Sequence, residues 1–511
     1  MKKINFIQNT LQGTLWGVGN KLIAVLFPFI LRTTIIKKLG AEYAGLNSLF
    51  TSILQVLSLA DLGFSSAMVY SMYKPVAEED MNTISALLNF FRKIYISIGC
   101  IILVIGLAIM PFINKMISGE IPTDINIYIL YLIYLFNTVS SYLFFAYRTS
   151  ILSAYQKEAE ISKIQMIANI IMYIIQITVL IIFTNYYIYI VFLPIFTCIS
   201  NYMKYYYVKM KYPQICCKGN ITYLQREIIK KNVSALFLHK LGSVTVNTLD
   251  NIVISSILGL VLLSNYNNYY YLVSAVTSLI LIFFNSITAG IGNRIIIDSI
   301  EANRCNFYKI FYINGIIVSV STVCFFSSFQ DFIVIWLGKQ YLFDFLTMIL
   351  MCSYFYVHTI RRTVISYRDA AGMWLNNKWQ PVVSAIVNLV LNIILIQVIG
   401  IKGVILSTII SMLIIDIPWE SKKLIQDLFN MSTKKYYKRM SIFTLITFTS
   451  CIIMFMIMKA LVIANINLKL VVEFLLSLIV GSVFFVLLTF RMSEFREVSK
   501  KIISICKFFK T

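Results

Sequence analysis

The sequence predicts an all-α polytopic membrane protein, and three observations support this fold class. Of its 511 residues, 59% are hydrophobic and 13% are charged, whereas soluble domains hold about half apolar and a quarter charged residues. Apolar runs of about 20 residues, each long enough to cross a hydrocarbon core of about 30 Å as a helix, recur from end to end. None of these runs alternates polar and apolar residues in the manner of a barrel strand.

The apolar runs predict about 14 transmembrane helices. The first run follows a mildly basic start, but further spans follow it at once, so we expect a retained helix rather than a cleaved signal. The predicted spans lie near residues 13–33, 44–70, 94–114, 126–148, 163–183, 186–206, 236–258, 268–291, 309–329, 341–360, 380–399, 403–420, 441–463 and 468–490.

The longest predicted inner loop divides six helices from the remainder. Two halves built on one plan are a recurring arrangement in transporters. Lys21 precedes Leu39-Gly40 by 18 residues, and Lys240 precedes Leu258-Gly259 by the same interval. We therefore expect an N-terminal six-helix bundle over 1–208, a basic cytoplasmic linker over 209–235, a second six-helix bundle over 236–425, and two extra helices with a basic cytoplasmic tail over 426–511.

The positive charge is distributed unevenly between the predicted loops. The formal net charge is +22, and the densest basic cluster runs from Lys204 to Lys231. Lys and Arg are retained in cytoplasmic loops, so this asymmetry predicts a multi-pass plasma-membrane protein with both termini cytoplasmic. Attraction to anionic membrane lipids accounts for the basic loops better than nucleic-acid binding does.

Several kinds of chemistry have no sequence signal. The nine cysteines lack paired spacing and the chain has two histidines, so we expect no disulfide framework and no metal site. The only Gly-Lys step, Gly338-Lys339, continues into Gln340, which leaves no phosphate-binding loop for ATP. With no cofactor signal and no large extramembrane loop, we expect a transporter rather than an enzyme.

Charged residues inside membrane spans are costly, so each is a candidate functional residue. Two groups have structural explanations. Asp416 and Glu420 lie at an inner helix end, where we expect them to pair with Lys422 and Lys423. Glu473 is expected near the start of the last span, where the helix dipole favours an anion.

Lys21, Arg32 and Lys240 are the cations that remain. They either snorkel to the interface or line a cationic cavity, which suits an anionic substrate because phosphate oxygens removed from water need charge-assisted donors. Asp250 lies ten residues after Lys240, too far along one helix for a direct pair, so its partner comes from another helix, and Arg32 is one candidate. Asp61, beside Gly63, is expected to mark a helix break, to pair with a cavity cation or to couple an ion.

Five segments carry a family resemblance. They are LGAEYAGLNSLFTSILQVLSLADLGFSSAMVYSMYKPVAEEDMNTISALLNFFRKIY at 39–95, TLDNIVISSILG at 248–259, FNSITAGIGN at 284–293, YRDAAGMWLNNKWQP at 367–381 and GVILSTIISMLIIDIPWE at 403–420. Together they resemble bacterial polysaccharide repeat-unit flippases of the O-antigen, capsule or teichoic type. These flippases belong to the multidrug/oligosaccharidyl-lipid/polysaccharide exporter superfamily.

The resemblance implies two six-helix bundles around a central cavity. Alternating access would move an undecaprenyl-diphosphate-linked oligosaccharide from the inner to the outer leaflet, with a polysaccharide polymerase complex as a further partner. Family members use cationic lumen residues for the diphosphate, and by helix position Lys21, Arg32, Lys240 and Arg294 take this role here. A lipid II flippase, a multidrug antiporter and a membrane polysaccharide polymerase or ligase remain as alternatives.

Overall fold

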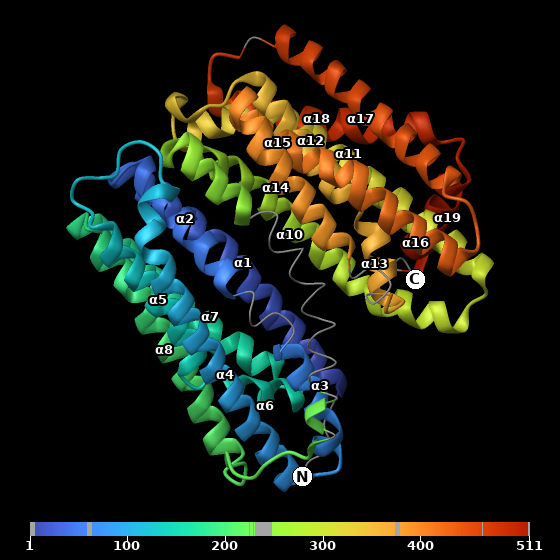
Figure 1. Ribbon diagram of the computed structural model, residues 1–511. Helices are drawn as coiled ribbons and strands as arrows, with labels where there is room; N and C mark the ends of the chain where they lie inside the picture. The colour runs from blue at the N-terminus through green and yellow to red at the C-terminus, as the bar shows by residue number, and fades with distance from the viewer. Residues whose placement is uncertain are drawn as a thin grey trace. The chain divides into compact units, whose positions relative to one another are not determined.

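The computed structural model shows an all-helical chain, as the sequence predicts (Figure 1). It divides into two compact units, Met1–Ser264 (unit 1) and Asn265–Thr511 (unit 2). The residues that the structure describes are 6–58, 64–223, 225–227, 229, 248–373, 379–461 and 463–508, with side chains described outside 6–15, 65–67, 289 and 501–508. The bundle boundaries that we predict at residues 208 and 236 stay a prediction.

Unit 1 is built mainly from long apolar helices. The longest of these, α1, packs along α7, and α5 packs against α4 and α8. Its elements are α1 (Phe6–Lys38), α2 (Ala41–Leu57), α3 (Phe64–Ala77), α4 (Met81–Ile109), η2 (Met110–Met116), α5 (Ile127–Leu143), η3 (Ala146–Arg148), α6 (Thr149–Ala154), α7 (Glu158–Phe183), α8 (Tyr186–Lys211), the helix Thr248–Leu258 and the first residues of α10 (Leu260–Ile297).

Side-chain caps and residues with positive φ mark the boundaries of helices in unit 1. The Asn126 side chain accepts from the backbone of Tyr128 and Ile129 at the start of α5, which satisfies amides that lack a partner within the helix. Gly40 separates α1 from α2 with φ of +123°, a conformation that costs glycine little because it has no Cβ. These short connections keep consecutive helices adjacent.

Unit 2 continues α10 and adds the remaining helices. In it α11 packs against α12, α17 and α18, while α14 packs against α15. Its further elements are α11 (Ile300–Trp336), η4 (Lys339–Tyr341), α12 (Phe345–Ile360), α13 (Arg362–Ala370), α14 (Gln380–Ile399), α15 (Ile401–Ser411), the π-helical turn η6 (Met412–Asp416), α16 (Ile417–Phe429), α17 (Lys434–Ala460), α18 (Ile466–Thr489) and α19 (Ser493–Phe508).

Ten helices among the described residues are long and apolar enough to cross a membrane, and an eleventh is added if the bent pair Ile127–Leu143 and Ala146–Ala154 is one span. Three predicted spans are not among them. Two, 44–70 and 236–258, include residues outside the described part of the chain. The third, 341–360, corresponds to α12, which has 16 residues. The total of 14 therefore stays a prediction.

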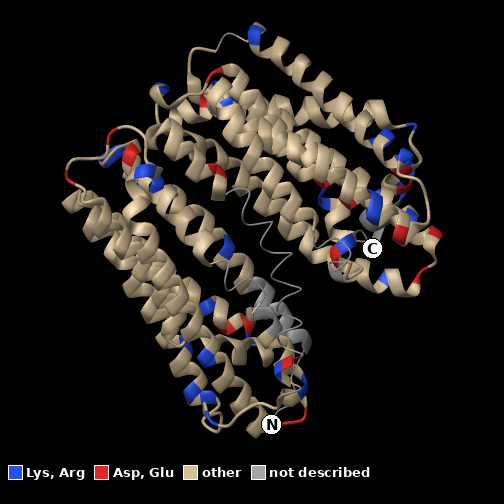
Figure 2. Ribbon diagram, viewed as in Figure 1, with Lys and Arg blue, Asp and Glu red and all other residues tan. Residues whose placement is uncertain are grey.

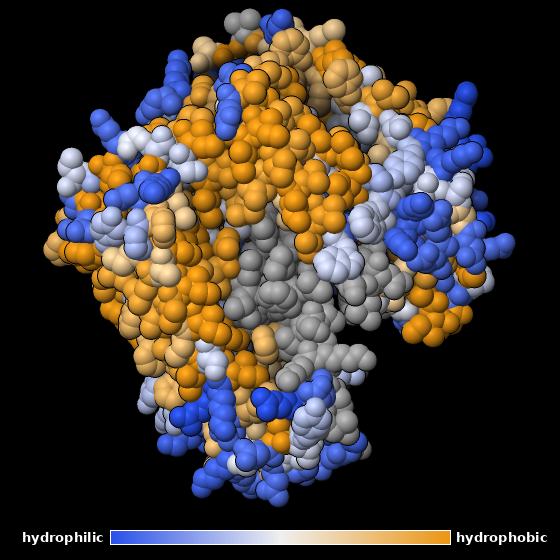
Figure 3. Space-filling view, viewed as in Figure 1, coloured by the Kyte–Doolittle hydropathy of each residue, from blue (hydrophilic) through white to orange (hydrophobic). Residues whose placement is uncertain are grey.

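The surface of each unit agrees with a membrane environment. Figure 2 shows most Lys, Arg, Asp and Glu residues near helix ends and connections, with long stretches of helix that carry none. Figure 3 shows apolar surface over the helices and hydrophilic residues gathered near their ends. A lipid-facing helix needs this distribution because charged side chains are costly within hydrocarbon.

Candidate functional site

Two of the predicted substrate-binding cations lie on one face of α1. Lys21, which is exposed, and Arg32, which is half-buried, are 11 residues apart, so they differ by about 20° around the helix and lie about 16 Å apart along it. Another face of α1 packs against α7, where Phe27 stacks on Tyr173 with 5.4 Å between ring centroids. Phe27 is rotated by more than about 100° from either cation, so both point away from this contact.

Arg32 also joins three helices within unit 1. Its guanidinium donates to Ser48 Oγ of α2 at 3.4 Å and to the backbone carbonyl of Ser264, in α10, at 2.9 Å. The phenols of Tyr186 and Tyr189 in α8 lie close enough to interact with its charge. Arg32 therefore has a packing role as well as the predicted binding role.

Asp250 is buried in the helix Thr248–Leu258, with 1% of its surface exposed. The neighbouring Asn251 donates to Ser52 Oγ of α2 at 2.8 Å, one turn beyond the serine that Arg32 contacts. The structure thus brings Arg32 and the segment that carries Asp250 to consecutive turns of α2. Direct pairing of Asp250 with Arg32 stays a prediction.

A close approach of backbone fixes this part of unit 1. A Cβ at Gly45 in α2 would lie 2.3 Å from the carbonyl oxygen of Leu260 in α10. Such a distance is far below van der Waals contact, so only glycine allows α2 and the start of α10 to meet here. The contact holds α10 beside the helix that receives Arg32.

The other predicted site residues are distributed along the chain. Asp61 and Lys240 lie outside the described residues. Arg294 is exposed near the end of α10 in unit 2, where its backbone carbonyl accepts a hydrogen bond from Asn303 Nδ2 at 3.0 Å. The structure therefore groups Arg32 and the Asp250 segment, with Lys21 on the same face of α1 as Arg32.

A buried ion-pair cluster in unit 2 was not predicted. Arg361 donates through Nε and Nη2 to the two carboxyl oxygens of Glu420, at 3.1 and 2.9 Å, and through Nη1 to Asp416. Arg368 donates to Glu420 at 3.1 Å and Gln380 donates to Asp416. Arg368 also pairs with the partly exposed Asp369 at 3.0 Å. Each buried carboxylate thus has a guanidinium partner, which stabilises its charged form.

Our prediction that Lys422 and Lys423 pair with these carboxylates was therefore wrong about the partners. The reason lies in the backbone, because Pro418 has no N–H to donate to the preceding turn and the chain forms the π-helical turn η6 just before it. The predicted pairing with Lys422 and Lys423 assumed a regular helix through this segment. The sequence did indicate that Asp416 and Glu420 are charged residues within a span, but it did not indicate which residues pair with them.

Lys204 is a second residue that the sequence did not single out. We counted it with the basic inner loop, at the end of the predicted span 186–206, and it lies in α8 with 8% of its surface exposed. Its amine is 2.8 Å from Gln165 Oε1 in α7, which also accepts from Ser200 at 3.2 Å. Among the described residues no carboxylate forms an ion pair with Lys204, so unit 1 carries a buried cation between α7 and α8.

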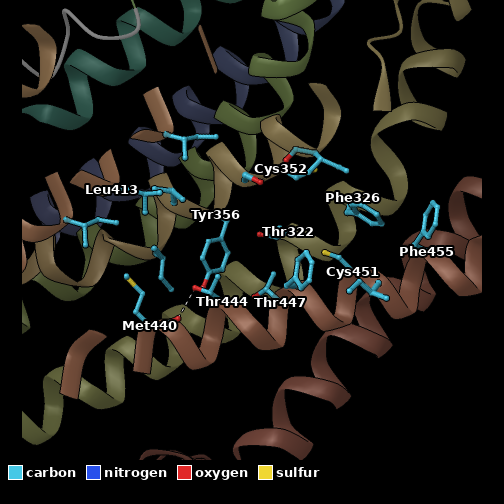
Figure 4. A pocket seen from close by; sticks show the side chains of 18 of the residues that line it. Thr322, Phe326, Cys352, Tyr356, Leu413, Met440, Thr444, Thr447, Cys451 and Phe455 are labelled. Atoms are coloured by element: carbon cyan, nitrogen blue, oxygen red, sulfur yellow. Dashed lines mark hydrogen bonds between the residues drawn. The ribbon is translucent and has the colours of Figure 1, made fainter. Parts of the chain in front are cut away.

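Unit 2 contains a cavity of about 490 Å³ between α11, α12, α15, η6, α16 and α17. Figure 4 shows its side chains, which are mostly apolar, and the hydrogen bond between Tyr356 Oη and Thr444 Oγ1, at 3.0 Å. Because these two hydroxyls satisfy each other, the cavity offers little to a charged group. Its chemistry suits a hydrocarbon chain. The residues labelled in the figure are Thr322, Phe326, Cys352, Tyr356, Leu413, Met440, Thr444, Thr447, Cys451 and Phe455.

The described residues also contain no group of three or more His, Cys, Asp or Glu side chains arranged to hold a metal ion.

Comparison with known proteins shows the fold. No family model matches the chain, and no curated protein matches it. Among solved structures, the lipid II flippase MurJ in an inward closed conformation is 14% identical with a TM-score of 0.66, covering 94% of this chain and 99% of that chain. An inward-facing multidrug resistance MATE family transporter of the MOP superfamily is 14% identical with a TM-score of 0.58, covering 79% and 95%.

The Vibrio cholerae MATE transporter VcmN is 13% identical with a TM-score of 0.54, covering 83% of this chain and 98% of that chain. These structures are all transporters or flippases. The chain therefore has a polytopic membrane-transporter fold similar to those of MurJ and MATE proteins.

Proposed function

We propose that this protein is a flippase of the multidrug/oligosaccharidyl-lipid/polysaccharide exporter superfamily. It moves undecaprenyl-diphosphate-linked oligosaccharide repeat units from the cytoplasmic to the outer leaflet by alternating access, for assembly of a surface polysaccharide. The observation that carries the proposal is the agreement of 94% of the chain with 99% of the lipid II flippase structure. A fold shared over nearly the full length of both chains favours a lipid-linked substrate.

The chemistry of unit 1 supports an anionic headgroup. Lys21 is exposed on the face of α1 that also carries Arg32, and guanidinium and ammonium groups form charge-assisted hydrogen bonds to phosphate oxygens. In this mechanism Lys21 and Lys240, which begin the two predicted bundles, hold the diphosphate in the inward-open state. Arg32, nearer the predicted outer end of α1, receives it as the protein opens outward, and Arg294 adds positive charge from α10.

The cavity of unit 2 supports a lipid-linked cargo rather than a free sugar. Its lining between α12 and α17 is apolar (Figure 4), so an isoprenoid chain that enters it from the hydrocarbon of the bilayer stays in an apolar environment. In the proposed cycle this cavity takes part of the isoprenoid chain while the headgroup crosses.

Two transport alternatives have specific support. A lipid II flippase is favoured by the similarity to the lipid II flippase MurJ, with a TM-score of 0.66, and a multidrug antiporter by the similarity to the MATE structures, with TM-scores of 0.58 and 0.54. The cations on α1 favour an anionic substrate over a cationic drug. A membrane polymerase or ligase is the enzyme alternative, and the resemblance to transporter structures disfavours it.

Deletion of the gene followed by complementation tests the proposal. Deletion should remove the surface polysaccharide and cause the lipid-linked repeat unit to accumulate. The double variant Lys21→Gln, Lys240→Gln should fail to restore export while the protein remains in the membrane at normal abundance. The matched control is Lys37→Gln, Lys38→Gln, which removes the same charge from the exposed end of α1 and should restore export.

The accumulated lipid decides between the candidates. Build-up of lipid II in place of a repeat unit would support the lipid II alternative, and a change in drug susceptibility without either lipid would support the antiporter. Normal export by the double lysine variant would overturn the proposed role of Lys21 and Lys240.

A further inference from the structure

A second group of charges lies between α11 and α18 in unit 2, and the proposed function does not use it. We expected Glu473 near the start of the last span, held by the helix dipole. The structure places it eight residues into α18, beyond the first turn, with none of its surface exposed. The dipole acts only within the first turn, so Glu473 needs another explanation.

The helices α11 and α18 run antiparallel, and their contacts fix which residues face one another. Tyr312 Oη lies 2.8 Å from Thr489 Oγ1, and Cys324 Sγ lies 3.2 Å from Ser477 Oγ. At the beginning of α18, Lys469 Nζ lies 2.8 Å from Asp331 Oδ2. As the position in α11 rises, its partner in α18 falls by nearly the same number of residues. Glu473 is thereby placed between the Ser477 and Lys469 contacts.

Glu473 and Asp331 form a carboxyl pair beside one ammonium group. Lys469 Nζ is 3.6 Å from Glu473 Oε1, a distance beyond a hydrogen bond, and neither carboxyl oxygen of Glu473 accepts a hydrogen bond from a described residue. Lys469 Nζ is also 2.8 Å from Asp331 Oδ2, so the two carboxyl groups share one ammonium group. Two ionised carboxylates beside a single ammonium leave one buried negative charge without a partner, and a proton on one carboxyl group removes that charge.

In the part of the chain that the structure describes, Lys469 is the one cation within ion-pair distance of the two carboxyl groups. Leu470 and Phe474 of α18 and Phe332 of α11 line an apolar cavity of about 600 Å³ that α10 closes with apolar residues. The other charged or titratable groups on the described elements packed against this half of α18 are Cys324 of α11 and, on α17, Cys451 and Lys459, whose amine lies 4.6 Å from the Phe455 ring centroid. An isolated buried carboxylate is costly in such a setting.

We propose that Asp331, Lys469 and Glu473 form a site that binds one proton between α11 and α18. The proton is shared by the two carboxyl groups, and the Lys469 ammonium neutralises the remaining negative charge. Protonation adds one O–H bond and changes the charge of the site from −1 to zero. Exposure gives the route of entry, because the side chains of Asp331 and Lys469 are 16% and 29% exposed while that of Glu473 is 0% exposed.

Infrared difference spectroscopy of the full-length protein in lipid tests the site, with the pH stepped upward from neutral. The wild type should show loss of a protonated carboxylic-acid carbonyl band. Glu473→Gln, whose amide resembles the protonated acid in shape, should lack this band change and should fold normally. Asp331→Asn should also lack it, since no second carboxylate remains to share the proton. The matched control Glu301→Gln, at an exposed position in α11, should retain the band change in full.

Two results would overturn the proposal. One is a band change of equal size in the wild type and in Glu473→Gln. The other is loss of the wild-type band when sodium chloride replaces choline chloride at constant pH, because a site that exchanges its proton for sodium is a general monovalent cation site. This test needs no transport substrate, so its outcome is independent of the proposed flippase function.

Discussion

Arg361 forms a two-pronged ion pair with Glu420 inside unit 2, with nitrogen–oxygen distances of 3.1 and 2.9 Å. The pair joins the end of α12 to α16, and the side chain of Glu420 is only 2% exposed. Parallel donation by one guanidinium to both oxygens of a carboxylate is a strong and directional contact. It positions the helices that border the apolar cavity.

Loss of this pair should destabilise the protein. Glu420→Gln leaves two buried guanidinium groups without their shared carboxylate, and breaking a buried ion pair costs about 3–5 kcal/mol. The free energy of unfolding in detergent or lipid, measured by denaturant titration, should fall by this amount. Asp427→Asn, at an exposed position on the same helix α16, is the control and should change it by less than about 0.5 kcal/mol. Equal stability of both variants would contradict the structural role of the cluster.

A methyl group at position 45, in the variant Gly45→Ala, should destabilise unit 1. The added Cβ would lie 2.3 Å from Leu260 O, and relieving such overpacking costs about 1–3 kcal/mol. Gly17→Ala in α1 is the matched control, since no atom lies within 4 Å of its Cβ position and alanine favours a helix by about 1 kcal/mol. Thermal unfolding should therefore shift down for Gly45→Ala and up for Gly17→Ala. An unfolding temperature of Gly45→Ala at or above that of the wild type would contradict the close approach of α2 and α10.

Filling the cavity of unit 2 should impair movement of a lipid-linked substrate. Ser353 of α12 lines the cavity, and its hydroxyl donates to the Ile349 carbonyl of its own helix. Ser353→Phe adds a ring to a volume of about 490 Å³. We expect accumulation of the lipid-linked intermediate in cells with normal protein abundance. Ser353→Ala removes the hydroxyl without filling space and should behave as the wild type. Normal export by Ser353→Phe would exclude this cavity from the path of the lipid.

The membrane potential should accelerate export. A diphosphate headgroup moves negative charge outward, and a potential that is negative inside favours this by about 2.3 kcal/mol per charge for each 100 mV. In proteoliposomes, the flux of the lipid-linked oligosaccharide should rise with an imposed potential and fall when an ionophore removes it. Flux that ignores the potential but follows a sodium or proton gradient would instead favour ion coupling through Asp61 or Asp250.

The attachment of α19 should depend on pH. Hydrogen bonds from Lys309 and Cys305 of α11 lower the pKa of Glu497 below its ordinary value. A lowered pKa in the folded state stabilises the docked helix at pH values above the ordinary glutamate pKa of about 4.3, and this contribution is lost as the pH falls through the folded-state value. The hydrogen-exchange protection factor of α19, which corrects for the slower intrinsic exchange in acid, should therefore fall as the pH is lowered. Glu497→Gln should remove this dependence, and an unchanged acid response in that variant would contradict it.

Parts of the fold could be predicted from composition because membrane helices obey strong local constraints. A span such as 163–183 needs only apolar side chains of sufficient length, and the structure places α7 there. The region 44–70 shows the limit, since α2 ends at Leu57, inside the predicted span. Hydropathy reports that residues are apolar, but a helix end depends on backbone hydrogen bonds that hydropathy does not record.

Composition and hydropathy predicted the all-helical fold class, the candidate cations on α1 and the expectation that intramembrane charges matter. How those charges are used depends on the packing of the helices. It pairs Arg361 with Glu420, buries Lys204 against Gln165, and places Glu473 and Asp331, 142 positions apart in the chain, beside the ammonium group of Lys469. The physical reason is that a buried charge is stabilised by its partner in space, and helix packing chooses that partner from residues distant in sequence.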